Sequence, residues 1–264
     1  MPHISSYRHG VPNWIDVSSA DPDTAVRFYG ALFGWAAPEQ GPEFGGYRIF
    51  EKAGLPVAGV GPAMAGPPAW TTYVNVDDCD AALARVGEAG GTVAAPAMDL
   101  PAGNGRIAFA VDPAGGFVGL FQAGPNHAGA ALVNEVGTLV WNELNVRDPK
   151  SAMPFYEHVF GWEFAAMEGA PSEYHVVMLH GRAIAGVMTM NDNFPEHVPT
   201  HWLPYFVVED ADATAAACEA NGGGVVVPPY VTGMGPMAVL RDPSGAVFAI
   251  GAMAQTDDPN EWPS

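Results

Sequence analysis

The chain has 264 residues, of which 48% are hydrophobic and 15% charged, so it can bury a sizeable core and is not expected to be disordered. Its formal net charge of −19 repels phosphate backbones, which argues against a nucleic-acid partner and favours a ligand that carries positive charge. The sequence has no long apolar run and no basic, apolar leader, so we expect no membrane partner, a cytoplasmic location and two reduced cysteines, Cys79 and Cys218.

The first predicted elements are a strand that starts at Trp14 and the helix that follows it. The Asp21–Pro22 pair supplies a capping side chain and a proline suited to the first helical position. Gly34 predicts the helix end. Between them, apolar residues recur at helical spacing at Ala25, Phe28, Tyr29 and Leu32.

The rest of the first half is predicted to be strands around a second helix. YRIFE and VAGVGPAM predict two short strands joined by a turn at Gly54. TTYVNVDDCDAALARVGEAGG then repeats the order of strand, Asp cap and helix. RIAFAVDPAGGFVGLFQ predicts a closing hairpin that turns at Asp112. The half therefore reads as two modules, each a strand, a helix and further strands.

The second half repeats the first. Residues of the first half recur 127 positions later, where Trp14, Asp21, Phe28-Tyr29 and Phe33-Gly34-Trp35 become Trp141, Asp148, Phe155-Tyr156 and Phe160-Gly161-Trp162. After a short insertion, Trp70, Tyr73 and Asp112 become Trp202, Tyr205 and Asp242. This period has the length of a domain rather than of a solenoid repeat. We predict one domain over residues 1–124, a linker over 125–136 and a second domain over 137–264.

Two motifs, each present twice, resemble those of the vicinal oxygen chelate superfamily, which includes glyoxalase I, extradiol dioxygenases and bleomycin resistance proteins. They are the D-x(6)-FY-x(3)-FGW stretch and the D-P-x-G hairpin, and the resemblance runs from about Val11 to Met253. It implies an α+β fold in which each pair of βαβββ modules forms an incomplete β-barrel around a cleft. Four modules in one chain give two such clefts, so we expect a monomer or a homodimer.

The resemblance also implies positions for a divalent metal, and the residues there do not suit one. Family enzymes place a His on the first strand of a module and a Glu on the last strand. The equivalent residues are Trp14 and Gly119 in the first copy, and Trp141 and Ala249 in the second. The indole nitrogen is a donor only, and Gly and Ala have no ligand atom in their side chains. We therefore predict no metal and no cofactor.

Aromatic residues are predicted to line the clefts instead. Tryptophan and tyrosine present a flat face and one polar group, which suits a planar hydrophobic ligand. Asp16 and Glu143 lie two residues after the shared Trp and can receive a cationic group. The predicted ligand-binding residues are Trp14, Trp70, Tyr73, Trp141, Glu143, His201, Trp202 and Tyr205. The alternative is that these aromatic residues only fill the barrel.

Two functions remain open from the sequence. The first, which we favour, is metal-independent binding or sequestration of a flat hydrophobic molecule, with or without an amine, such as an aromatic secondary metabolite or antibiotic. The second is an enzyme of secondary metabolism: a metal-free cyclase, isomerase or hydroxylase, or a metal-dependent lyase or dioxygenase. Candidate catalytic groups for an enzyme are Glu143, His201 and Asp16.

Overall fold

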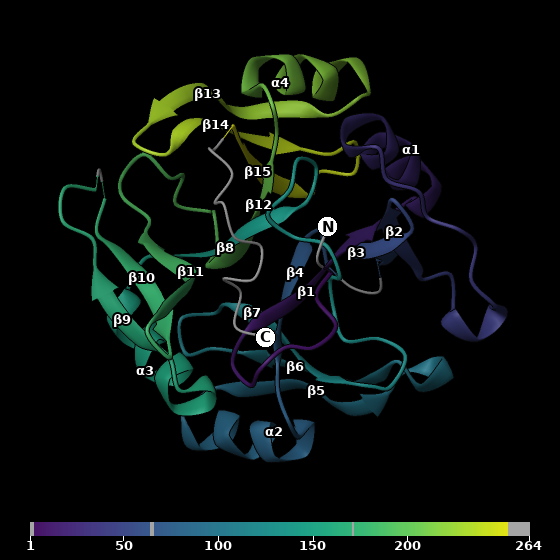
Figure 1. Cartoon of the computed structure of the whole chain (residues 1–264). Coiled ribbons are helices and arrows are strands. Elements are labelled where there is room, and N and C mark those ends of the chain that lie inside the picture. The colour runs from purple at the N-terminus through teal and green to yellow at the C-terminus, as the bar shows by residue number, and fades with distance from the viewer. Residues whose placement is uncertain (1–2, 64–65, 171, 253–264) are drawn as a thin grey trace.

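The computed structural model describes residues 3–63, 66–170 and 172–252, and the end of the predicted second domain, 253–264, lies outside them. The described residues form two large sheets and four α-helices (Figure 1). None of these helices is long and apolar enough to cross a membrane. The α+β class and the tandem modules are confirmed, and neither sheet closes into a barrel.

The first half contains β1 (Pro12–Ser19), α1 (Pro22–Phe33), β2 (Arg48–Lys52), β3 (Leu55–Pro62), β4 (Trp70–Asn75), α2 (Cys79–Glu88), β5 (Thr92–Asp99), β6 (Gly105–Val111) and β7 (Phe117–Ala123). The second half contains β8 (Leu139–Val146), α3 (Pro149–Phe160), β9 (Glu163–Ala166), β10 (Tyr174–Leu179), β11 (Arg182–Thr189), β12 (His201–Val207), α4 (Ala211–Ala220), β13 (Gly224–Thr232), β14 (Gly235–Arg241) and β15 (Val247–Gly251). In the first module, the strand equivalent to β9 is reduced to a single bridge between Ala36 and Glu51.

Each half forms its own sheet around a central antiparallel pair of strands. The order is β2-β3-β1-β4-β7-β6-β5 in the first sheet and β13-β14-β15-β12-β8-β11-β10-β9 in the second. In every module, the first strand lies beside the last strand and runs parallel to it, as β1 does with β3 and β4 with β7. Side chains alternate along a strand, so β1 and β4 direct one set of residues to the helices and the other to the opposite, cleft face.

The helices begin and end where local chemistry dictates. Asp21 caps α1 by accepting hydrogen bonds from the backbone N–H groups of Asp23 and Thr24. Gly34 then stops the helix with a positive φ of 72°, a conformation that costs glycine little. The helix α3 repeats this arrangement with Asp148 and Gly161.

The hydrophobic cores cross between the two halves. Helix α1 packs beside α4, and α2 packs beside α3 (Figure 1). As a result, one core joins the first module to the fourth, and the other joins the second to the third. Hydrogen bonds follow the same pattern, because the Tyr156 hydroxyl donates to Asp112 Oδ2 (2.8 Å) and the Tyr29 hydroxyl to Asp242 Oδ2 (3.2 Å). The helical faces are thus buried, and the cleft face of each sheet remains for function.

Candidate ligand-binding site

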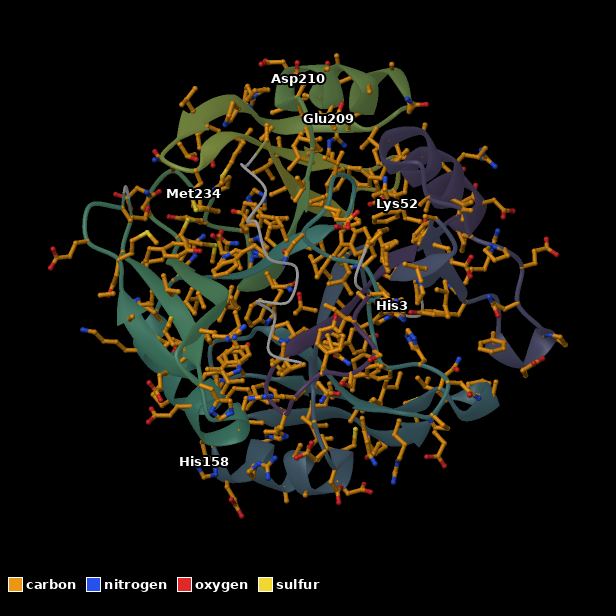
Figure 2. All side chains as sticks on the ribbon, in the orientation of Figure 1. His3, Lys52, His158, Glu209, Asp210 and Met234 are labelled. Carbon is orange, nitrogen blue, oxygen red and sulfur yellow. The ribbon has the colours of Figure 1, made fainter. Side chains whose placement is uncertain are left out.

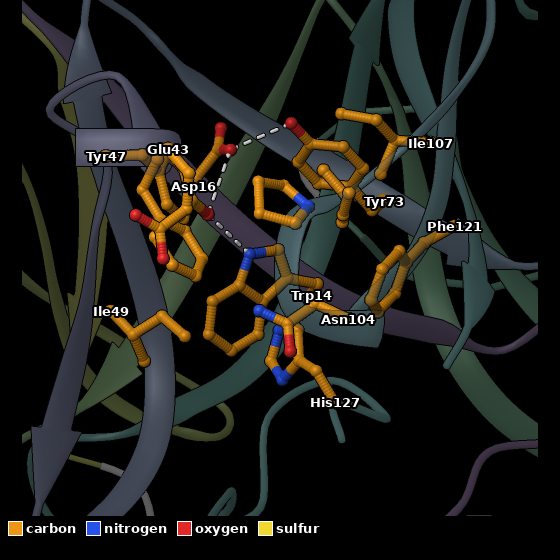
Figure 3. A pocket seen from close by; sticks show the side chains of 13 residues that line it. Trp14, Asp16, Glu43, Tyr47, Ile49, Tyr73, Asn104, Ile107, Phe121 and His127 are labelled. Carbon is orange, nitrogen blue, oxygen red and sulfur yellow. Dashed lines mark hydrogen bonds between the residues drawn. The ribbon is translucent and has the colours of Figure 1, made fainter. Parts of the chain in front are cut away.

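A cavity of about 200 Å³ lies on the cleft face of the first sheet (Figure 3). Most of its wall is aromatic or aliphatic: Trp14, Phe44, Tyr47, Ile49, Tyr73, Leu100, Ile107 and Phe121. The polar groups on it are few, with Asp16, Glu43, Asn104 and His127 as the main ones. An apolar hollow with a small number of convergent polar groups is the usual form of a small-molecule site.

A chain of hydrogen bonds fixes the carboxyl group of Asp16 in this wall. Trp14 Nε1 donates to the Tyr47 hydroxyl (2.9 Å), and that hydroxyl donates to Asp16 Oδ2 (3.3 Å). The Tyr73 hydroxyl donates to the same oxygen at 2.8 Å (Figure 3). The two tyrosines come from β4 and from the residue before β2, so three segments hold one carboxyl group. We call Trp14, Asp16, Tyr47 and Tyr73 the Asp16 cluster.

Burial raises the pKa of Asp16 to about 6, although hydrogen bonds from Tyr73, Tyr47 and Thr71 act in the opposite direction. The carboxyl is therefore mostly ionised at pH 7 and gains a proton just below neutral pH. A group of this kind can accept a hydrogen bond, pair with a cation or transfer a proton.

Glycines on the neighbouring strands make room for the two tyrosine rings. A Cβ atom at Gly59 would overlap the Tyr47 hydroxyl, and a Cβ at Gly119 would overlap the Tyr73 ring. Tyr73 therefore lies over the strand position that the family resemblance assigned to a metal-ligating Glu.

These residues do not fit a divalent metal. Trp14, Tyr73 and Gly119 are adjacent across β1, β4 and β7, and they present an indole, a phenol ring and no side chain. A carboxylate at position 119 would collide with the Tyr73 ring. Within the described parts of the chain, no group of three or more His, Cys, Asp or Glu side chains is placed to hold a metal ion.

The segment between the two halves forms part of the cavity wall. His127 stands edge-on to Trp14 with ring centroids 4.5 Å apart, and burial lowers its pKa to about 4, so the ring is neutral at pH 7. The segment is anchored because Asn13 O accepts from the Ala130 N–H (2.8 Å) and Asn13 Nδ2 donates to Ala128 O (3.1 Å). His127 lies outside the repeated motifs, so its place in the cavity wall could not be predicted from the sequence.

The second half contains an equivalent group of residues, the Glu143 cluster, made of Trp141, Glu143, Tyr174 and Tyr205. Trp141 Nε1 donates to the Tyr174 hydroxyl (3.0 Å), and the Tyr205 hydroxyl donates to Glu143 Oε1 (2.9 Å). Burial raises the pKa of Glu143, whose side chain is 4% exposed. Ala249, the register partner of Tyr205, occupies the place of Gly119. Tyr47 and Tyr174 stand 127 residues apart, at the same position of the repeat, but the sequence alone does not show that they contact the carboxyl groups.

Two predicted cleft residues lie elsewhere. Trp70 and Trp202 point to the helical face of their strands, and their indole N–H groups donate to the hydroxyls of Tyr29 (3.1 Å) and Tyr156 (3.1 Å). Each belongs to one of the crossed cores. The placement in the cleft was wrong because Trp70 is three residues before Tyr73, and an odd separation on a strand reverses the face.

His201 lies on the cleft side of β12 but apart from the Glu143 cluster. It pairs in register with Asn145, while Leu203 pairs with Glu143. Its Nδ1 lies 2.9 Å from Pro199 O, so Nδ1 carries the proton and Nε2 is left as an acceptor. Burial lowers its pKa. The structure thus brings Trp14, Asp16 and Tyr73 together in one half, and Trp141, Glu143 and Tyr205 together in the other.

Family models match both halves of the chain. Residues 14–120 match a glyoxalase-like domain, and residues 136–250 match the glyoxalase/bleomycin resistance protein/dioxygenase superfamily.

Several relatives align with this chain over nearly its full length. The protein named "Putative glyoxylase CFP32" from Mycobacterium tuberculosis is 44% identical over 95% of this chain and 97% of its own length. The anthracycline biosynthesis proteins DauV from a Streptomyces species and DnrV from Streptomyces peucetius are each 33% identical over 94% of both chains.

Solved structures resemble this fold at low sequence identity. A Mn(II)-bound glyoxalase from Novosphingobium aromaticivorans superposes with a TM-score of 0.66 at 15% identity, over 95% of this chain and 84% of that one. The 2,3-dioxygenase LapB from a Pseudomonas species superposes with a TM-score of 0.66 at 15% identity, over 97% and 96%. At this level of identity the likeness concerns the fold alone.

Proposed function

This chain belongs to the glyoxalase/bleomycin resistance protein/dioxygenase superfamily, and we propose that on this fold it binds a flat, mainly hydrophobic small molecule without a metal ion. The observation that carries the proposal is the Asp16 carboxyl, which two tyrosine hydroxyls hold in an otherwise apolar cavity. A polar group in such a wall fixes the orientation of a ligand, while the rings supply most of the contact area.

The size of the cavity limits how much of a ligand it encloses. A volume of about 200 Å³ is smaller than the range of roughly 300–1,000 Å³ that is usual for drug-sized ligands. The cavity therefore suits one or two fused rings, and the remainder of a larger molecule would extend into solvent. Two relatives are named as anthracycline biosynthesis proteins, which supports an aromatic secondary metabolite as the ligand class.

Charge favours an amine on that ligand. The chain has a formal net charge of −19, and Asp16 is mostly ionised at neutral pH. The indole face of Trp14 also attracts a cation. A ligand amine beside Asp16 would gain from all three, whereas an anionic ligand would be repelled.

Calorimetric titration with an anthracycline and with a neutral naphthoquinone tests the proposal. Trp14→Leu should weaken binding by about tenfold or more, because it removes both a ring wall and the donor to Tyr47. The matched control is Trp141→Leu, which removes the same contacts in the second half and should leave this affinity unchanged. Equal effects of both variants, or no binding of either ligand by the native protein, would refute the first-half assignment.

A second candidate function is acid–base catalysis on a similar substrate. Because its pKa is about 6, Asp16 can take and return a proton near neutral pH. This raised pKa is the observation that favours a cyclase or isomerase over a protein that only binds its ligand. The Asp16→Asn variant separates the two functions. An enzyme loses turnover while neutral ligands still bind, whereas a binding protein shows no turnover before or after the change.

A further inference from the structure

A buried amide in the second half has no hydrogen-bond partner in the described structure. The side chain of Asn145, on β8, is 1% exposed, and neither Nδ2 nor Oδ1 makes a hydrogen bond. It lies close enough to Glu143 to favour the ionised form of that carboxyl, yet it does not meet the geometry of a hydrogen bond. Burying an amide without partners destabilises a folded protein, so such a group calls for an explanation.

Strand geometry places Asn145 on the cleft face. Trp141, Glu143 and Asn145 alternate along β8, so all three point to the same side of the sheet. His201 of β12 is the partner of Asn145 in register. The second half thus has a row of three polar residues, Glu143, Asn145 and His201. The row begins in the Glu143 cluster and ends at the start of β12.

The first half lacks this row at the same positions. Ser18 stands where Asn145 does, because Ser18 pairs with Gly61 as Asn145 pairs with Met188. The Ser18 hydroxyl donates to Ala69 O (3.2 Å) and accepts from the Ala69 N–H (3.1 Å), so it is satisfied within its own pair of strands. The fold therefore does not require an amide without partners at this position, and only the second half has one there.

The surroundings of the polar row are apolar. Leu203, Tyr205, Met237 and Ala249 form a separate buried cluster on this side of the second sheet. Tyr230 on β13 pairs in register with Met237 of this cluster and is 45% exposed, and Met234 in the turn after β13 is 58% exposed (Figure 2 labels Met234). An apolar surface beside a few hydrogen-bonding groups matches an amphipathic small molecule.

We propose that the second half holds its own binding site, for a neutral small molecule that presents a carboxamide-type pair of donor and acceptor to Asn145 and a hydroxyl to Glu143. The amide of Asn145 offers one donor side and one acceptor side, which a carboxamide complements with two hydrogen bonds. The acidic chain and Glu143 itself disfavour a carboxylate at this place. This site is independent of the first-half cavity and takes a different class of ligand.

Salicylamide carries both groups on one ring and serves as the probe. In NMR titration, we expect the side-chain NH₂ signal of Asn145, identified by its loss in Asn145→Ala, to shift with salicylamide. Calorimetry should show an affinity about tenfold lower for Asn145→Ala, the effect of losing a pair of neutral hydrogen bonds. Ser18→Ala is the matched control in the first half and should bind as the native protein does. Trp14→Leu, which weakens binding in the first cavity, should also keep the salicylamide affinity, and this result separates the two sites.

The melting temperature distinguishes a binding role from a structural one. If Asn145 is kept for a ligand, the unliganded Asn145→Ala variant melts at the native temperature or above it, since an unpartnered buried amide is removed. A fall of several degrees would show that Asn145 stabilises the fold, and would overturn the proposal. Unchanged salicylamide affinity in Asn145→Ala, or no binding by the native protein at millimolar salicylamide, would overturn it as well.

Discussion

Replacing Asp16 by Asn should stabilise the protein at neutral pH. The pKa of Asp16 in the folded protein is about 6, against an ordinary value of 3.8. For a carboxyl with a raised pKa, the contribution to stability is complete below the ordinary pKa and is lost as the pH rises through about 6. A difference of this size corresponds to about 3 kcal/mol, at about 1.4 kcal/mol per pKa unit. Asn avoids this loss because it stays neutral.

Urea unfolding at two pH values measures the effect. The advantage of Asp16→Asn over the native protein should approach about 3 kcal/mol at pH 7.5 and be about half of that at pH 5, where the native carboxyl is mostly protonated. The control is Glu39→Gln, which removes the same charge from an exposed position. If Asp16→Asn is destabilised at pH 7.5, or its advantage does not change with pH, the carboxyl is not held at a cost to the fold. The proposed reason for its presence would then fail.

Three further outcomes are expected. In urea unfolding, Tyr156→Phe should lower the free energy of unfolding by about 1–3 kcal/mol, because Asp112 Oδ2 and Trp202 Nε1 lose the hydroxyl that they share. Tyr29→Phe should lower it by about as much in the other core. A negligible effect of both variants would contradict the stabilising role of these hydrogen bonds. Affinity for an amine-bearing ligand should fall as the pH drops through about 6, where Asp16 gains its proton, while a neutral analogue titrated in parallel should bind equally at pH 5 and pH 7.5. Elemental mass spectrometry on protein purified without chelator should find far less than one metal ion per chain, and about one iron, zinc, nickel or manganese would disprove our interpretation of the site.

The modules could be predicted from the sequence because their signals are local. The Asp21 cap and the Gly34 stop act within one helix, and both are found as expected. Which modules share a core could not be predicted. The buried faces of α1 and α2 are both apolar stripes, and nothing in their spacing says that α1 meets α4 rather than α2. That choice is made by packing across the two halves.

The candidate site was predicted in part. Trp14, Asp16 and Tyr73 do converge, since the repeat placed them on the first strands of adjacent modules. Trp70 was assigned to the wrong face of the sheet, because a residue three positions before Tyr73 on a strand points to the opposite side. His127 was missed for a different reason, because a loop residue reaches the cavity by tertiary folding that no repeat or periodicity records.

The remaining question from the sequence is whether the duplicated aromatic residues line a ligand site or merely fill the barrel. A filler gains nothing from a carboxyl group, since burial raises the pKa of both Asp16 and Glu143 and so works against their charged forms. An apolar side chain at either position would fill space at lower cost. In the first half, moreover, the same residues surround a cavity of about 200 Å³ rather than a packed centre. A carboxyl group held by two tyrosines beside such a cavity is more readily explained by a ligand than by packing.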